Sequence, residues 1–243
     1  MPRVALVTGA SRGLGRAIAA SLARDHAVAV AYRTGADEAK ETLRLVEAAG
    51  GEGIVTCADV RHPAAVDELF SDVEDALGPV EVLVNNAGCR ADALAVRLRD
   101  EDWSTVLETS LGGSFACSRR ALRPMLRAGW GRIVNVSSVA ALRGNAGQAN
   151  YCAAKAGVVG LTKALAREVG RKGITVNAVA PGLVDTDLVA DLDPARRAAL
   201  LEEVPAGRTG TPAEIAAAVR FLCSDDAAYV NGCVMTVDGG MTA

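Results

Sequence analysis

Histidine, paired cysteines and long apolar runs are all scarce in this chain, and each scarcity excludes a class of protein. The two histidines, His26 and His62, lie far apart and in no cluster of metal-binding residues, so we expect no metal site. No Cys-x-x-Cys pair occurs among the six cysteines, at positions 57, 89, 117, 152, 223 and 233. We expect small free thiols in a reducing cytoplasm rather than disulfides.

Charge and hydropathy exclude two further classes. A net charge of −3 and an isoelectric point near 5.5 give no electrostatic reason to expect nucleic acid as a partner. No apolar run approaches the roughly 18 residues that a membrane span needs. The apolar run that follows Met1-Pro2-Arg3 is too short for the core of a signal peptide. We therefore expect a cytoplasmic protein with no membrane partner.

What the chain does have is enough apolar material for one large core. Half of its 243 residues are hydrophobic, and there are no internal repeats, low-complexity tracts or linkers. We expect a single domain over residues 1–243.

Short apolar runs alternate with helix-favouring segments along the whole chain. This alternation predicts an α/β fold of the Rossmann type, a doubly wound parallel sheet of about seven strands with helices on both faces. Strands are expected at residues 4–8, 26–32, 53–57, 80–84, 132–137, 174–179 and 233–237. In the helical segment expected over residues 101–128, Leu107, Leu111 and Phe115 recur at helical spacing and are expected to face the core.

A glycine-rich turn joins the first strand to the first helix. Residues 8–15 read Thr-Gly-Ala-Ser-Arg-Gly-Leu-Gly. Glycines allow a tight turn and a close approach of the backbone to a phosphate, and a helix N-terminus favours negative charge. Placed between a strand and a helix, this form predicts a dinucleotide site. Its expected cofactor-binding residues are Gly9, Ser11, Arg12, Gly13 and Leu14.

The residue after the second strand bears on the choice between NAD and NADP. Arg33 stands where an NAD enzyme places a carboxylate for the adenosine ribose. Asp37 or Glu38 fit that role by spacing alone, but they lie past the turn, where acids favour a helix start. Arg33 and Arg12 together suit a 2′-phosphate, which favours NADPH. Taken singly, each arginine is equally well explained as a solvated surface charge.

Two later strand ends also carry polar residues. Asp59 and Val60 follow the third strand, where the carboxylate can accept a hydrogen bond from an adenine amino group. Asn85 to Gly88 follow the fourth strand, at the edge where open α/β sheets bind ligands. We expect Asn86, Ala87 and Gly88 to line the cofactor site, with a simple turn as the alternative.

Tyr151 and Lys155 lie one turn apart on a helix expected to run to Val169. At this spacing an ammonium stabilises a phenolate and is expected to lower the pKa of the tyrosine, so that it can serve as a general acid. An aromatic anchor beside a solvated lysine is the alternative. After the sixth strand, residues 183–205 form the least regular segment and suit either a lid over a substrate or an ordinary surface loop.

These motifs together resemble the short-chain dehydrogenase/reductase family along the whole chain. The resemblance is carried by residues 8–15, residues 85–88, Ser138, Tyr151 with Lys155, and Pro181-Gly182 with Thr186. Within the family, residues 144–151 and 232–241 are most similar to the β-ketoacyl-[acyl-carrier-protein] reductases.

The resemblance implies residue roles. Tyr151 would give a proton to a ketone oxygen that Ser138 orients, and Lys155 would bind the nicotinamide ribose. The nicotinamide would lie against residues 181–186, including Pro181, Gly182, Val184 and Thr186. Where the family has an asparagine before the long helix, this chain has Ser110, whose backbone carbonyl would hold a proton-relaying water.

The function that the resemblance implies is NADPH-dependent reduction of a β-ketoacyl thioester on an acyl carrier protein, in fatty-acid or polyketide synthesis, by a homotetramer. Alternatives are a dehydrogenase for a small alcohol, sugar or steroid, and a catalytically weak cofactor-binding subunit paired with an active homologue. An acidic carrier would dock on a basic patch beside the cleft, for which the candidates are Arg127, Arg132, Arg171 and Lys172.

Overall fold

Seven short, mostly buried segments form the strands of one parallel sheet in the computed structural model, which describes residues 2–186 and 194–243. Their spatial order is β3-β2-β1-β4-β5-β6-β7. Strands rich in Val, Ala and Leu on both faces are typical of a parallel sheet that is covered on both sides. The fold class predicted from the sequence is confirmed. The strands are β1 (Arg3–Thr8), β2 (His26–Tyr32), β3 (Gly53–Cys57), β4 (Val80–Asn85), β5 (Gly131–Val136), β6 (Ile174–Pro181) and β7 (Val234–Val237).

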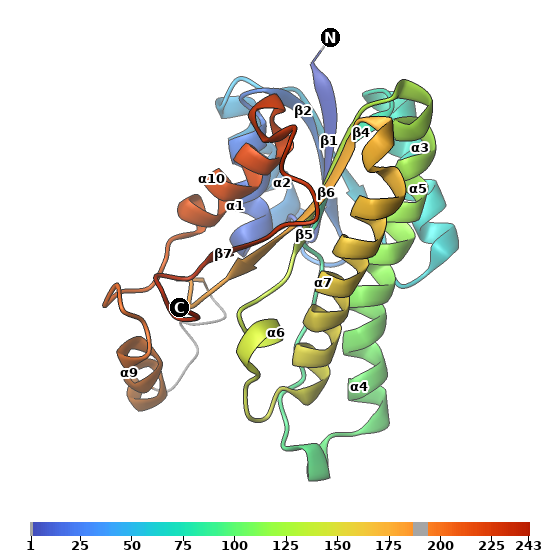
Figure 1. Ribbon diagram of the computed structural model, residues 1–243. Helices are drawn as coiled ribbons and strands as arrows, with labels where there is room; N and C mark the ends of the chain where they lie inside the picture. The colour runs from blue at the N-terminus through green and yellow to red at the C-terminus, as the bar shows by residue number, and fades with distance from the viewer. Residues whose placement is uncertain (1, 187–193) are drawn as a thin grey trace.

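Helices cover both faces of the sheet (Figure 1). One layer consists of α1 (Gly13–Leu22), α2 (Ala36–Ala48) and α10 (Pro212–Cys223). The other consists of α3 (Pro63–Ala76), α5 (Gly113–Ala128) and α7 (Ala149–Val169). The shorter elements are η1 (Ala95–Arg97), α4 (Asp100–Leu107), η2 (Glu108–Gly112), α6 (Ala140–Arg143), η3 (Gly170–Lys172), α9 (Pro194–Glu202) and η4 (Asp225–Ala227).

The chain reverses its direction of winding between β1 and β4, which are neighbours in the sheet. A crevice forms at such a point, outside the carboxyl ends of the strands. Gly9 packs tightly there: its φ is +63°, and an added Cβ would lie 2.9 Å from the Cα of Ala87. Only glycine fits this approach, which joins the glycine-rich turn to the segment after β4.

The helical segment expected over residues 101–128 is interrupted. A π-helical turn, η2, lies between α4 and α5. Such a turn inserts an extra residue into the helix and is frequent at functional sites.

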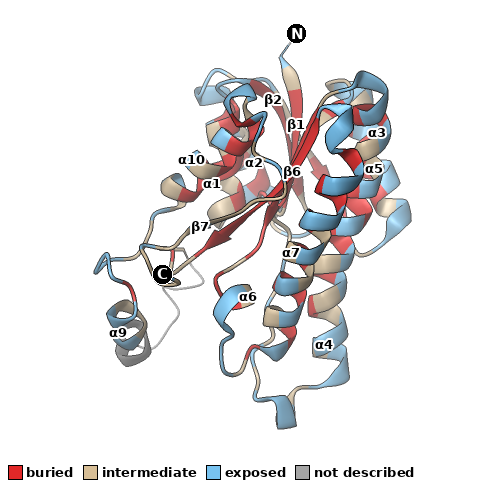
Figure 2. Cartoon of the chain, viewed as in Figure 1, coloured by how far each residue is buried: buried red, intermediate tan, exposed pale blue. Residues whose placement is uncertain are grey.

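The expectation that this segment turns its apolar residues to the core is wrong in part. Phe115 is 45% exposed, and Leu107 and Leu111 are only partly buried. Figure 2 shows most of α4 coloured as exposed or intermediate. The core is contacted instead by small residues of α5 such as Ala116 and Ala121. Trp103 and Leu126 are also 40% and 44% exposed, so α4 and α5 present large apolar side chains to the outside. In the part of the chain that the structure describes, no helix is both long and apolar enough to cross a membrane.

Candidate active site

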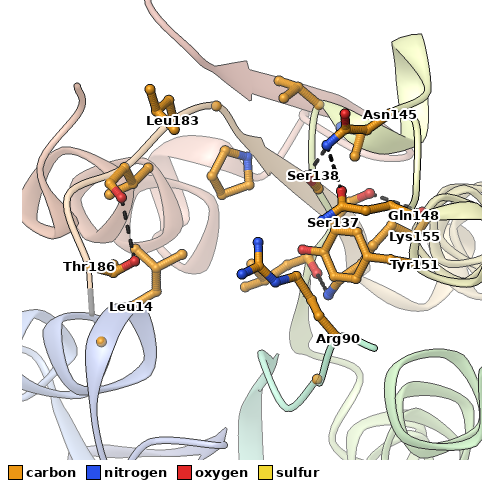
Figure 3. Close-up of a pocket in the computed structure, with 18 of the residues that line it drawn as sticks. Leu14, Arg90, Ser137, Ser138, Asn145, Gln148, Tyr151, Lys155, Leu183 and Thr186 are labelled. Carbon is orange, nitrogen blue, oxygen red and sulfur yellow. Dashed lines mark hydrogen bonds between the residues drawn. The ribbon is translucent and has the colours of Figure 1, made fainter. Parts of the chain in front are cut away.

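A cavity of about 410 Å³ opens at the carboxyl edge of the sheet (Figure 3). Its walls come from the loops after β1, β4, β5 and β6 and from the start of α7. The residues predicted for the site that line it are Arg12, Gly13, Leu14, Asn86, Gly88, Ser138, Tyr151, Lys155, Pro181, Gly182, Val184 and Thr186. The remaining predicted residues, Gly9, Ser11, Arg33, Asp59, Val60, Ala87 and Ser110, lie outside its lining.

Ser138, Tyr151 and Lys155 meet at one wall of the cavity. Ser138 follows the end of β5, and its hydroxyl forms a hydrogen bond with Tyr151. Lys155 lies one turn along α7, with its Nζ 5.7 Å from the centroid of the Tyr151 ring. The Lys155 Nζ also donates a hydrogen bond of 2.7 Å to the carbonyl of Val136. Two hydroxyls and an ammonium therefore converge on a space that a carbonyl group can enter.

The pKa of Tyr151 is shifted upward in this structure, not downward as expected from its pairing with Lys155. Burial raises the pKa of Tyr151 above its ordinary value of 10.0, and the hydrogen bond from Ser138 and the charge of Arg90 oppose this rise without overcoming it. The tyrosine therefore holds its proton at neutral pH, which suits a proton donor. Burial also lowers the pKa of Lys155, from 10.5 to about 8.

Ser110 lies in the π-helical turn, close to Lys155. Its side chain is buried, and its Oγ has no hydrogen-bond partner among the described residues. A Cβ added to Gly88 would lie 3.2 Å from that Oγ and 3.5 Å from the Lys155 Nζ, so both atoms adjoin the same small space. The Ser110 carbonyl already accepts a hydrogen bond of 2.6 Å from the Ser114 hydroxyl. The hydroxyl of Ser110 is thus without a partner in the described part of the chain, whereas its carbonyl accepts one hydrogen bond and has a second lone pair.

The glycine-rich turn fits a dinucleotide diphosphate. No side chain caps the N-terminus of α1, so its first backbone N–H groups are available to an anion. Gly13 has a φ of +57°, and a Cβ built on it would meet no atom within 4 Å. Behind the turn, Asn86 donates hydrogen bonds of 3.0 and 2.9 Å to the carbonyls of Thr8 and Gly9. The turn is rigid and open on the side that a phosphate would approach.

The residues predicted for the adenosine end lie at neighbouring strand ends. Arg12 and Arg33 have exposed side chains with no ion-pair partner in the described part of the chain. Asp59 accepts hydrogen bonds from Arg61, the shortest of 2.6 Å, and these lower the pKa of its carboxyl to about 2. The sequence reasoning missed Arg61, which holds Asp59 ionised and in place.

The proposed docking patch is wrong as a surface beside the cleft. Arg127, Arg171 and Lys172 precede β5 and β6, whereas Ser138 and Pro181 lie at the far ends of those strands. In a parallel sheet all strand starts lie on one side and all strand ends on the other, so these residues lie on the side away from the cleft. Arg132 is moreover buried, and its guanidinium donates to the carbonyls of Gly131, Gly173 and Ser224.

Sequence reasoning also missed cavity residues that no motif marks. Arg90 and Arg143 bring positive charge to the cavity, and Leu183, Leu200 and Met241 bring apolar surface. Of the segment considered as a lid, residues 187–193 lie outside the described part of the chain.

Comparison with known proteins assigns the family. A family model described as enoyl-(acyl carrier protein) reductase matches residues 9–242. The 3-oxoacyl-[acyl-carrier-protein] reductases FabG of Pseudomonas aeruginosa and Escherichia coli are 48% and 45% identical to this chain. Each alignment covers 98% of this chain and 97% of the relative. The chain belongs to the short-chain dehydrogenase/reductase family.

Solved structures of this family from Agrobacterium tumefaciens have the same fold. One, named as a proposed gluconate dehydrogenase, is 36% identical, with a TM-score of 0.94 over 98% of this chain and 95% of that one. Another, named as a proposed 2-deoxy-D-gluconate 3-dehydrogenase and solved with bound NADP, is 40% identical, with a TM-score of 0.91 over 98% and 96% of the two chains.

Proposed function

We propose that this chain is an NADPH-dependent reductase that converts a 3-oxoacyl thioester, carried on an acyl carrier protein, to the 3-hydroxyacyl thioester in fatty-acid synthesis. The observation that carries the proposal is the convergence of Ser138, Tyr151 and Lys155 on one cavity, in a chain up to 48% identical to FabG reductases over nearly its full length. The same ketone reduction on a polyketide intermediate is an extension of this proposal.

NADPH, when bound, supplies the hydride. The backbone of Gly13 and Leu14 at the start of α1 would hold its diphosphate, and Arg12 and Arg33 its 2′-phosphate. Asp59 and Val60 would contact the adenine, and residues 181–186 the nicotinamide. This assignment fits the uncapped α1 terminus and the two unpaired arginines.

The remaining steps belong to this chain's own side chains. Ser138 donates a hydrogen bond to the ketone oxygen and fixes its direction. Tyr151 gives its proton to that oxygen as negative charge develops there. The tyrosinate left behind is stabilised by the ammonium of Lys155, 5.7 Å from the ring centroid. Ser110 would support Lys155 through a water that its hydroxyl and the Nζ both reach.

A second candidate is oxidation or reduction of a sugar acid, which the similarity to the two Agrobacterium structures favours. The names 3-oxoacyl reductase and 2-deoxy-D-gluconate 3-dehydrogenase both place the reacting carbon at position 3 of an acid or acyl chain. A cofactor-binding subunit without activity of its own is the third candidate. The intact set of Ser138, Tyr151 and Lys155 speaks against it.

We also propose that the enzyme works in the cytoplasm as a homotetramer. All six cysteines are free thiols, which suits a reducing compartment. The exposed Trp103, Phe115 and Leu126 on α4 and α5 suit burial against a second copy. Light scattering should show a smaller assembly for the Phe115→Glu variant than for the wild-type protein. An identical mass for both proteins would contradict this surface.

The test of the activity is NADPH consumption with a panel of substrates. Acetoacetyl thioester on an acyl carrier protein should be the best substrate, ahead of crotonyl thioester, 2-deoxy-D-gluconate (assayed with NADP⁺) and simple ketones. A sugar acid as the best substrate would transfer the assignment to the second candidate. An enzyme that binds NADPH and turns over nothing would transfer it to the third.

A further inference from the structure

Arg90 is an exposed cation that lines the catalytic cavity and that the steps above leave unused. It follows Gly88 and Cys89 in the loop after β4 and lines the cavity. Figure 3 shows its side chain directed into the cavity beside Tyr151, and its charge acts on the Tyr151 phenol. Among the described residues it has no ion-pair partner. Arg143, which also lines the cavity, forms an ion pair with Glu203.

The loop that carries Arg90 is fixed to the helix that carries Tyr151. Asn150 donates a hydrogen bond of 3.0 Å to the carbonyl of Ala91, the next residue along the chain. Gln148 donates one of 2.9 Å to the carboxylate of Asp92, and the backbone N–H of Ala93 donates one of 2.8 Å to the carbonyl of Gly147. These three contacts fix the backbone that carries the guanidinium relative to the catalytic tyrosine.

The bond to Gln148 also explains why Arg90 keeps its charge available. Asp92 is the nearest acid in the loop sequence, and its carboxylate accepts from Gln148 rather than from Arg90. A guanidinium donates through several N–H groups in one plane and therefore suits a carbonyl or carboxylate oxygen. Because Ser138, Tyr151 and Arg90 line one cavity, a substrate whose ketone is held by Ser138 and Tyr151 can place a second, nearby oxygen against the guanidinium.

We propose that Arg90 is a specificity residue, which binds the second oxygen of a substrate whose ketone lies two carbons from a thioester carbonyl or a carboxylate. The inference rests on the proposed function and deepens it. It explains how one cavity can suit 3-oxoacyl thioesters and 3-oxo acids alike and discriminate against ketones that lack the second oxygen. Charge-assisted hydrogen bonds of this kind contribute enough free energy for a preference of about tenfold to a hundredfold.

The experiment measures binding separately from turnover. NADP⁺ has no hydride to give, so acetoacetyl-N-acetylcysteamine and acetoacetate stay intact on the NADP⁺-loaded protein, and calorimetry gives their Kd. Arg90→Gln should weaken both ligands by about tenfold to a hundredfold, and Arg90→Lys should weaken them less. Arg97→Gln is the matched control, because Arg97 ends η1 in the same loop and is exposed outside the cavity lining.

The outcomes separate this inference from the proposed function. Unchanged Kd values in Arg90→Gln, or a wild type that binds neither ligand, would overturn the assignment of Arg90. An equal loss of affinity for NADP⁺ itself would also overturn it, because Arg90 would then belong to the cofactor site. Weakened acetoacetate binding in a protein that does not reduce the thioester would support Arg90 and reject the proposed function.

Discussion

The Nζ of Lys155 lies 5.7 Å from the centroid of the Tyr151 ring and, from that position, donates a hydrogen bond of 2.7 Å to the carbonyl of Val136. The lysine is thus held between the end of β5 and the tyrosine by its own helix and its own hydrogen bond. The phenol and the ammonium keep one relative position before any ligand binds, and a preorganised site of this kind loses little free energy to reorganisation during the reaction.

Tyr151→Phe should abolish turnover and leave the fold intact. The substitution keeps the ring but removes the proton donor, and general acid catalysis contributes about 10²–10⁴-fold in rate. Steady-state kinetics with acetoacetyl thioester and a fluorescence titration with NADPH check the two parts. Tyr229→Phe is the control, because Tyr229 is fully exposed. A Tyr151→Phe enzyme as active as wild type would remove the tyrosine from the mechanism.

Lys155 should give the protein a distinctive dependence of stability on pH. Its pKa in the folded protein, about 8, lies below the ordinary 10.5. Between these values the unfolded chain binds a proton that the folded chain does not, so the free energy of unfolding rises with pH. Relative to Lys155→Met, wild type should gain about 2–3 kcal/mol between about pH 8 and pH 10. Urea denaturation measures both proteins, and parallel curves would contradict the lowered pKa of Lys155.

Ser110→Asn should leave activity within about tenfold of wild type, about 1.4 kcal/mol in the barrier. The Ser110 hydroxyl already adjoins the space next to Lys155 and Gly88, so an amide there replaces one polar group by another. Single-turnover kinetics under NADPH excess are the measurement. An inert wild type that Ser110→Asn activates would instead identify a subunit that has lost its own catalysis.

The preference for NADPH should depend on Arg33. Arg33→Asp should raise the KM for NADPH by about tenfold or more and narrow the preference over NADH, because a charge-assisted hydrogen bond becomes a repulsion. Arg24→Asp makes the same charge change just before β2, at the opposite end of the strand from Arg33. Equal use of both cofactors by wild type would show that the arginines have another purpose.

The strands and the chemical motifs were predictable because they depend on local sequence. The apolar runs place β2 and β3 at their observed bounds, and the order Ser138, Tyr151, Lys155 predicts one shared site. Phe115 was not predictable, because an apolar helix face has the same periodicity whether it meets the core or the outside.

Other features depend on tertiary structure. The prediction of a docking patch failed because its residues lie at the starts of β5 and β6, whereas the site motifs lie at the ends of these strands. The downward pKa shift expected for Tyr151 overlooked its burial, which only the packed structure reveals. Arg90 lies in an irregular loop, and the two residues after it are held by hydrogen bonds from Asn150 and Gln148, more than 50 residues away in the chain.

The most direct test of the proposed reaction is the fate of the hydride. The enzyme is given NADPH deuterated at the transferred position and acetoacetyl thioester on an acyl carrier protein, and the product is analysed by mass spectrometry and NMR. We predict a 3-hydroxybutanoyl thioester with one deuterium on carbon 3, the carbon that Ser138 and Tyr151 hold by its oxygen. Product without deuterium at carbon 3, or deuterium transferred only when crotonyl thioester replaces the ketone, would contradict the account.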